Sequence, residues 1–85
     1  MKQVTRVQTG VRMEKRILKV LKMIAEHHEI SLGDLLEGIV LHAFEGKCPF
    51  DEVSLLKIAK MKEIFALDLT AADSHLLIET EDKET

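Results

Sequence analysis

The sequence predicts a small, mainly α-helical fold: one short N-terminal strand paired across a homodimer, then two core helices and a C-terminal helical extension. Three observations predict this class. Residues 4–12 alternate in polarity, as a strand does. Three later segments instead repeat their apolar side chains at helical spacing. The chain has only 85 residues, of which 46% are hydrophobic and 4% aromatic, so its own core is small and association would help.

The N-terminal segment has a semi-apolar face and a polar face. Thr5, Val7, Thr9 and Val11 form the first, and Arg6, Gln8, Gly10 and Arg12 belong to the second. A lone strand cannot satisfy its own backbone N–H and C=O groups, and the chain offers no second strand of comparable quality. We therefore expect this strand to pair antiparallel with its copy in a second chain about a two-fold axis.

Apolar periodicity and capping patterns predict the helices. Ser31 with Asp34, and Thr70 with Asp73, match the capping box that begins a helix. Asp51 is a natural cap for a further helix, and Gly46 is a natural helix stop. The expected helices cover residues 14–28, from 32 to the stop at 46, 52–66, and from the cap at 70 to about 78.

Charge is distributed unevenly along the chain. The first 22 residues carry seven Lys or Arg against one acid, Glu14, a formal charge of +6, whereas the remainder carries five Lys against fourteen acids, a formal −9. Such an asymmetry indicates an anionic partner for the basic end. Double-stranded DNA is the first candidate, because an exposed two-stranded ribbon fits a major groove in which Arg can bind guanine and Gln can bind adenine.

We divide the chain into three parts. Residues 1–46 form the dimerisation and DNA-binding domain, residues 47–78 a helical extension, and residues 79–85, which have no apolar member, a disordered acidic tail. The extension could brace the dimer, bind a protein partner through residues 50–78, or pair dimers along an operator.

Residues 4–44, with their strand, helix, turn and helix, resemble the ribbon-helix-helix DNA-binding domain of the Arc and MetJ class of bacterial repressors. The resemblance implies that Gln8, Gly10 and Arg12 contact base edges, and it places a phosphate at Ser31, Leu32 and Gly33. Free amides and the helix dipole favour an anion at such a helix start. Gly10 lacks the polar side chain usual in the family, and Glu29 stands at a turn position where glycine is common.

Residues outside the resemblance complete the predicted interface. Arg6 shares the polar strand face with Arg12, so we expect it to contact bases as well. Lys15 and Lys19 lie on the outward face of the first predicted helix, where we expect phosphate contacts.

No cluster of nucleophile, base and orienting residue appears, and no spacing of His or Cys indicates a metal site, so we predict no enzyme, no cofactor and no metal. The single Cys48 cannot form an intramolecular disulfide, and the first residues lack the apolar run of a signal peptide, so we expect neither a signal peptide nor a membrane span. We expect a cytoplasmic protein without membrane contact.

Two functions follow from these patterns. The first is a homodimeric transcriptional regulator that reads the major groove. The second is a dimeric protein-interaction module, antitoxin-like or an adaptor, that does not read DNA. Arg6 and Arg12 distinguish them: an exposed pair favours DNA, whereas burial under the extension or ion pairs with its acids favour the interaction module.

Overall fold

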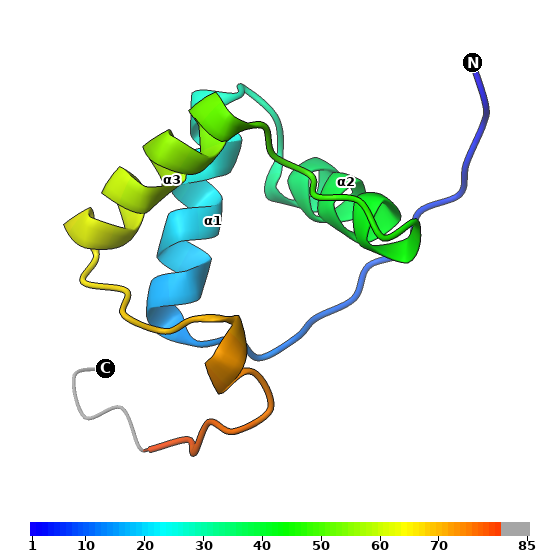
Figure 1. The fold of residues 1–85 in the computed structure, drawn as a ribbon. Helices are drawn as coiled ribbons and strands as arrows, with labels where there is room; N and C mark the ends of the chain where they lie inside the picture. The colour runs from blue at the N-terminus through cyan, green and yellow to red at the C-terminus, as the bar shows by residue number, and fades with distance from the viewer. Residues whose placement is uncertain (81–85) are drawn as a thin grey trace.

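The computed structural model describes residues 1–80, and three helices of 13 residues dominate it (Figure 1). They are α1 (Lys15–His27), α2 (Leu32–Phe44) and α3 (Glu52–Ile64), followed by a single 3-10 turn, η1 (Ala71–Asp73). The first three helices predicted from the sequence are therefore confirmed to within two residues at each end. In the described part of the chain, no helix is long and apolar enough to cross a membrane.

Each α-helix begins at a side chain that accepts hydrogen bonds from the first turn. Glu14 accepts from two amides of α1, at 2.7 and 2.9 Å. Ser31 and Asp51 each accept from the amide three residues further on, at 3.1 and 2.8 Å respectively. These acceptors satisfy amides that the helix itself leaves without a partner, which explains why Ser31 and Asp51 located the starts of α2 and α3 in the sequence.

Each α-helix also ends in the same way, with one residue in the left-handed region. These residues are Glu29, Gly46 and Ala66, with φ angles of 57°, 69° and 53°. The amide that follows each of them donates to the carbonyl five residues earlier, at 3.0, 2.9 and 2.8 Å. This is the Schellman motif, in which glycine is the usual left-handed residue. The helix stop predicted at Gly46 is confirmed.

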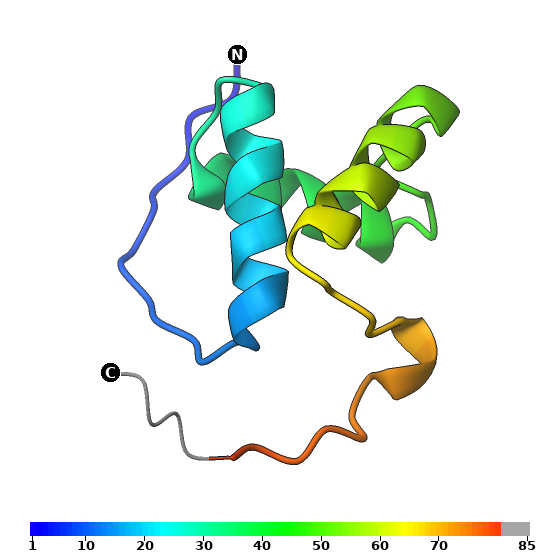
Figure 2. The ribbon, with the colours of Figure 1, turned by 90° about the vertical axis from the view of Figure 1, so that its left-hand side faces the viewer.

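Helix α1 lies at the centre of the fold. Both α2 and α3 pack against α1, and they do not pack against each other (Figures 1 and 2). The buried core consists of Val20, Ile24 and Ala25 of α1, Leu35 of α2 and Met61 of α3. Each outer helix is thus covered on one side only.

The predicted strand is wrong, and with it the strand-containing fold class, although a mainly α-helical fold is correct. Residues 1–14 are drawn as an extended trace without an arrow (Figure 1), and residues 1–80 contain no strand. Alternating polarity gives the segment a strand-like sequence, but a strand exists only where a neighbour completes its hydrogen bonds. No segment of the described chain does so, and Val4, Val7 and Val11 remain exposed.

The predicted helix after Thr70 is also wrong, because only η1 forms there. Asp73 accepts from the Thr70 amide at 2.8 Å, so the capping contact exists without the helix that it should begin. Leu76, Leu77 and Ile78 are exposed and bury no face that would extend the turn. Of the predicted disordered tail, residues 79 and 80 are exposed and irregular, and residues 81–85 lie outside the described part.

Candidate nucleic-acid interface

The four predicted base-contact residues lie on the extended segment that leads into α1. This segment runs from the N-terminus past α2 to the start of α1 (Figure 1). Arg6, Gln8, Gly10 and Arg12 are all exposed, and a side chain added at Gly10 would meet nothing within 4 Å. The segment therefore offers its polar groups to solvent, and Gly10 leaves room for a close approach to the backbone.

Arg6 forms a two-pronged ion pair with Glu37 of α2. Its Nε and Nη2 atoms donate to the two carboxylate oxygens, each at 2.9 Å. The hydrogen bond and the opposite charge raise the pKa of Arg6, and the same contacts lower the pKa of Glu37. The side chains are still 67% and 46% exposed, so water screens the pair and it contributes little to stability.

Arg12 forms an ion pair with Glu79, which is 67 residues away in the sequence. The C-terminal segment reaches this position because it turns back beneath the start of α1 after η1 (Figure 2). The Arg12 side chain is 84% exposed and that of Glu79 is 67% exposed. Both arginines that were expected to distinguish the two functions are therefore exposed and also ion-paired, Arg12 with an acid of the predicted tail.

The predicted phosphate contacts Lys15 and Lys19 both lie on α1 and are exposed. Lys15 is the first residue of α1 and is exposed. Lys19 lies one turn further on, with its ammonium group 5.9 Å from the centre of the Phe65 ring. At this distance the ammonium group and the ring form a cation–π interaction, which keeps the Lys19 side chain against the end of α3 although the residue is exposed.

The other predicted phosphate contacts, Ser31, Leu32 and Gly33, lie at the opposite end of α1. A helix of 13 residues is about 20 Å long, so Lys15 and the start of α2 are separated by roughly that distance. The Ser31 hydroxyl already accepts from the Asp34 amide, and Leu32 is half-buried. The structure therefore distributes the predicted phosphate contacts along α1 and does not gather them into one site.

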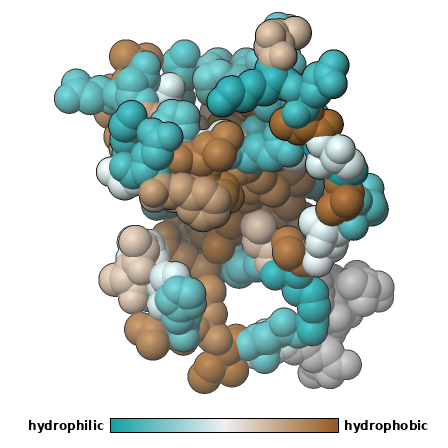
Figure 3. Space-filling view, turned by 90° about the vertical axis from the view of Figure 1, so that its right-hand side faces the viewer, coloured by the Kyte–Doolittle hydropathy of each residue, from teal (hydrophilic) through white to brown (hydrophobic). Residues whose placement is uncertain are grey.

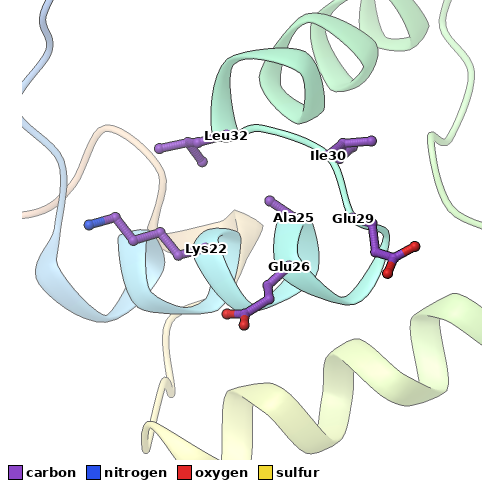
Figure 4. Close-up of a pocket in the computed structure, with 6 residues that line it drawn as sticks. All are labelled: Lys22, Ala25, Glu26, Glu29, Ile30 and Leu32. Atoms are coloured by element: carbon purple, nitrogen blue, oxygen red, sulfur yellow. The ribbon is translucent and has the colours of Figure 1, made fainter.

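A shallow hollow beside this end of α1 does not bring catalytic groups together. Lys22, Glu26 and Glu29 line it with Ala25, Ile30 and Leu32. Figure 4 shows the charged ends of Lys22, Glu26 and Glu29 pointing in three different directions, away from one another. The carboxylate of Glu29 also points away from Leu32, so it does not cover the start of α2.

Arg16, expected to point outward from the first helix, is half-buried and makes contacts that the sequence patterns did not predict. It donates to Glu14 at 2.8 Å, to the Ala66 carbonyl at 2.9 Å and to Asp68 at 3.0 Å. The hydrogen bond to Glu14 is the main reason why the pKa of Arg16 is raised. No sequence signal joins positions 50 residues apart, and only the folded chain shows that Arg16 attaches the segment after α3 to the start of α1.

The remaining reactive side chains are dispersed. His27 and His28 meet edge to face, 5.1 Å between ring centres, and His42 lies 2.7 Å from the Gly38 carbonyl of its own helix. The exposed Cys48 thiol donates to the Phe50 carbonyl at 3.3 Å. Within residues 1–80, no three His, Cys, Asp or Glu side chains are grouped so that they could hold a metal ion.

The arrangement offers exposed cationic hydrogen-bond donors on the extended segment and along α1, the chemistry that binds phosphates and base edges. It also offers acids that already form ion pairs with all three arginines, Arg6, Arg12 and Arg16. No family model, curated protein or solved structure matches this chain.

Proposed function

We propose that the protein is a homodimeric DNA-binding regulator of transcription. The observation that carries the proposal is the concentration of cations in residues 1–22, a formal +6 in a chain whose net charge is −3. Six of these seven cations are exposed, on the extended segment and on α1, where a polyanion can reach them, and the seventh, Arg16, is half-buried. The proposal places the dimer in the cytoplasm together with its DNA.

In this proposal the extended segment reads the bases and α1 binds the backbone. Arg12 and Gln8 have the donor and acceptor geometry that distinguishes guanine and adenine in the major groove. Lys15 and Lys19 supply charge to phosphates, which fixes position without reading sequence. The contact belongs to an extended segment and not to a paired ribbon, because the described residues form no strand.

The dimer is supported by apolar surface that the single chain leaves uncovered. Only five side chains form the buried core of residues 1–80, whereas sixteen large hydrophobic residues are exposed. Val40, Leu41 and Phe44 of α2 are among them, and Phe44 is 80% exposed. Figure 3 shows apolar side chains gathered across the middle of one face. Soluble monomers seldom present such a surface, and a second copy about a two-fold axis is the commonest way to cover it.

A mobility-shift experiment with genomic DNA fragments tests the proposal. We expect a subset of fragments to bind at low salt, and the affinity to fall steeply between about 50 and 200 mM salt as counterions are released. Lys19→Gln should reduce the salt dependence, whereas Lys60→Gln, on the exposed surface of α3, serves as the control of equal charge. Absence of binding to every fragment at low salt would contradict the proposal.

The second candidate is a dimeric protein-interaction module that does not read DNA. The ion pairs of Arg6 with Glu37 and of Arg12 with Glu79 favour it, since both arginines already have carboxylate partners. Residues 50–78 would then bind the partner, and α3 exposes Val53 and Leu56 for such a contact. Dimerisation without any binding to DNA at low salt is the result that selects this candidate.

A further inference from the structure

We propose that the acidic C-terminal segment is an internal competitor for DNA phosphate at the start of α1. This inference rests on the proposed DNA-binding function and adds its regulation. The chain after α3 carries carboxylates back to two of the cations that precede or begin α1. Arg12 is bound by Glu79, and Arg16 is bound by Asp68. Figure 2 shows the route of this segment beneath the start of α1.

The chemistry of the contact is that of a phosphate contact. A carboxylate and a phosphate both present oxygens to the same guanidinium donors, so one occupies the place of the other. The Arg16 nitrogen that donates to Asp68 also donates to the Ala66 carbonyl, at 2.9 Å, so two oxygens of this segment occupy a guanidinium that could otherwise bind phosphate oxygens. Arg12 therefore cannot engage a DNA phosphate or a base edge fully while Glu79 holds it.

Exposure makes the contact exchangeable. An ion pair with both side chains more than half exposed is weak, so DNA can displace it. Its effect comes from tethering: Asp68 is held at Arg16, so only the short segment from residue 68 to Glu79 attaches the competing carboxylate, at an effective concentration on the order of millimolar. The acids are also numerous, since residues 68–85 contain six acids against one lysine, a formal −5 beside the +6 of residues 1–22.

Two variants with one matched control test the competition. Glu79→Gln removes the charge that meets Arg12, and a chain ending after residue 78 removes the four acids of residues 79–85. Glu52→Gln is the control, because it removes the same charge at the distant first turn of α3. The probe is a short random-sequence DNA duplex, because a guanidinium that Glu79 releases attracts the phosphates of any duplex in addition to the base contact proposed for Arg12 on a cognate site.

We expect Glu79→Gln to raise the affinity for the duplex at low salt by about one-and-a-half- to fivefold, the range of an exposed ion pair, and the truncation to raise it further. Glu52→Gln should change the affinity less than Glu79→Gln does. In an Arg12→Ala background, Glu79→Gln should give no further gain, because the two residues act on the same contact.

A second readout needs no DNA. The NMR signal of the Arg12 side-chain N–H should shift on Glu79→Gln and remain in place on Glu52→Gln. An unmoved Arg12 signal would overturn the inference, and so would unchanged affinity for the duplex in Glu79→Gln while the wild type binds. Failure of the wild type and of every variant to bind DNA would instead overturn the proposed function, and the inference with it.

Discussion

Left-handed residues at the helix ends are the clearest source of local strain in this chain. Ala66 follows α3 with a φ of 53°, a region that costs a residue with a Cβ about 1–2 kcal/mol. The Ala66 amide donates to the Glu63 carbonyl at 3.1 Å, and the following amide closes the Schellman motif. The backbone at position 66 is thus held in this conformation by two hydrogen bonds, against the preference of its side chain.

We expect Ala66→Gly to stabilise the protein by about 0.5–1 kcal/mol, since relief of the left-handed conformation exceeds the added entropy of the unfolded chain. Denaturant unfolding measures the change. The control is Ala59→Gly inside α3, which should destabilise by about 1 kcal/mol because its backbone is already helical. Destabilisation of similar size at both positions would show that Ala66 is not strained.

Glu14 caps α1, and its titration makes the stability of the protein depend on pH. Burial raises the pKa of its carboxyl. The hydrogen bonds from the Arg16 side chain and from the Ile17 and Arg16 amides lower this pKa by more than burial raises it, so the net shift is downward. A carboxyl whose pKa is lower in the folded state stabilises the fold above its unfolded pKa, about 4.5 here. That contribution is lost as pH falls through the folded pKa.

We expect Glu14→Gln to lower the free energy of unfolding by about 1 kcal/mol at neutral pH, as the loss of a helix cap does. The variant should also lose part of the fall in stability that the wild type shows below about pH 4.5. Glu37 and Asp51 also have lowered pKa values, so the Glu14→Gln variant should still lose some stability in acid, but less than the wild type does. Denaturant unfolding across this pH range measures both effects, and identical pH profiles for the two proteins would contradict the assignment.

At the scale of the element, the sequence located the helices well because their ends are encoded locally. Ser31 and Asp51 cap α2 and α3, and Gly46 ends α2, as their residue types predicted. Glu29, noted as unusual at a turn, does adopt the left-handed conformation that favours glycine. The strand was predicted but is absent from residues 1–80, because strand hydrogen bonds depend on a neighbour that local sequence does not specify.

The candidate interface was predictable only in part. Residue type and alternation placed Arg6, Gln8 and Arg12 on an exposed segment, and exposure there is confirmed. Their partners were not predictable, since Glu37 and Glu79 lie 31 and 67 residues away and no local pattern joins them to arginine. The contacts of Arg16 were missed for the same reason.

The extended segment and α1 should make different contributions to DNA binding. We expect Arg12→Ala to weaken binding to a cognate site by about ten- to a hundredfold and to relax discrimination, because a base contact carries sequence information. Lys19→Gln should weaken binding to cognate and random duplexes by equal factors. Titration of both duplexes at several salt concentrations separates the two effects. Equal loss on both duplexes for Arg12→Ala would show that Arg12 binds phosphate only.

At the scale of the whole molecule, the arrangement of helices explains why a single copy has so small a core. Because α2 and α3 both pack on α1 and not on each other, each keeps an open side. Few apolar residues leave water, so the hydrophobic stabilisation of an isolated chain is limited. In the proposed dimer a second copy would cover this surface and add to the stability, so the concentration of the protein should then influence its unfolding.

The α2 face that includes Val40, Leu41 and Phe44 provides a direct test of self-association. In an isolated chain Phe44 is 80% exposed, so Phe44→Glu should alter the stability of a monomer by no more than about 0.5 kcal/mol. In a dimer that buries this face, the same change places an unpaired charge in the interface.

We expect the wild type to sediment as a dimer at micromolar concentration, with an unfolding midpoint that rises with concentration. Phe44→Glu should sediment as a less stable monomer. Lys60→Glu, a charge change on the exposed surface of α3, should leave the dimer intact. A wild type that is monomeric and whose unfolding midpoint does not change with concentration would contradict the dimer, because association makes that midpoint depend on protein concentration.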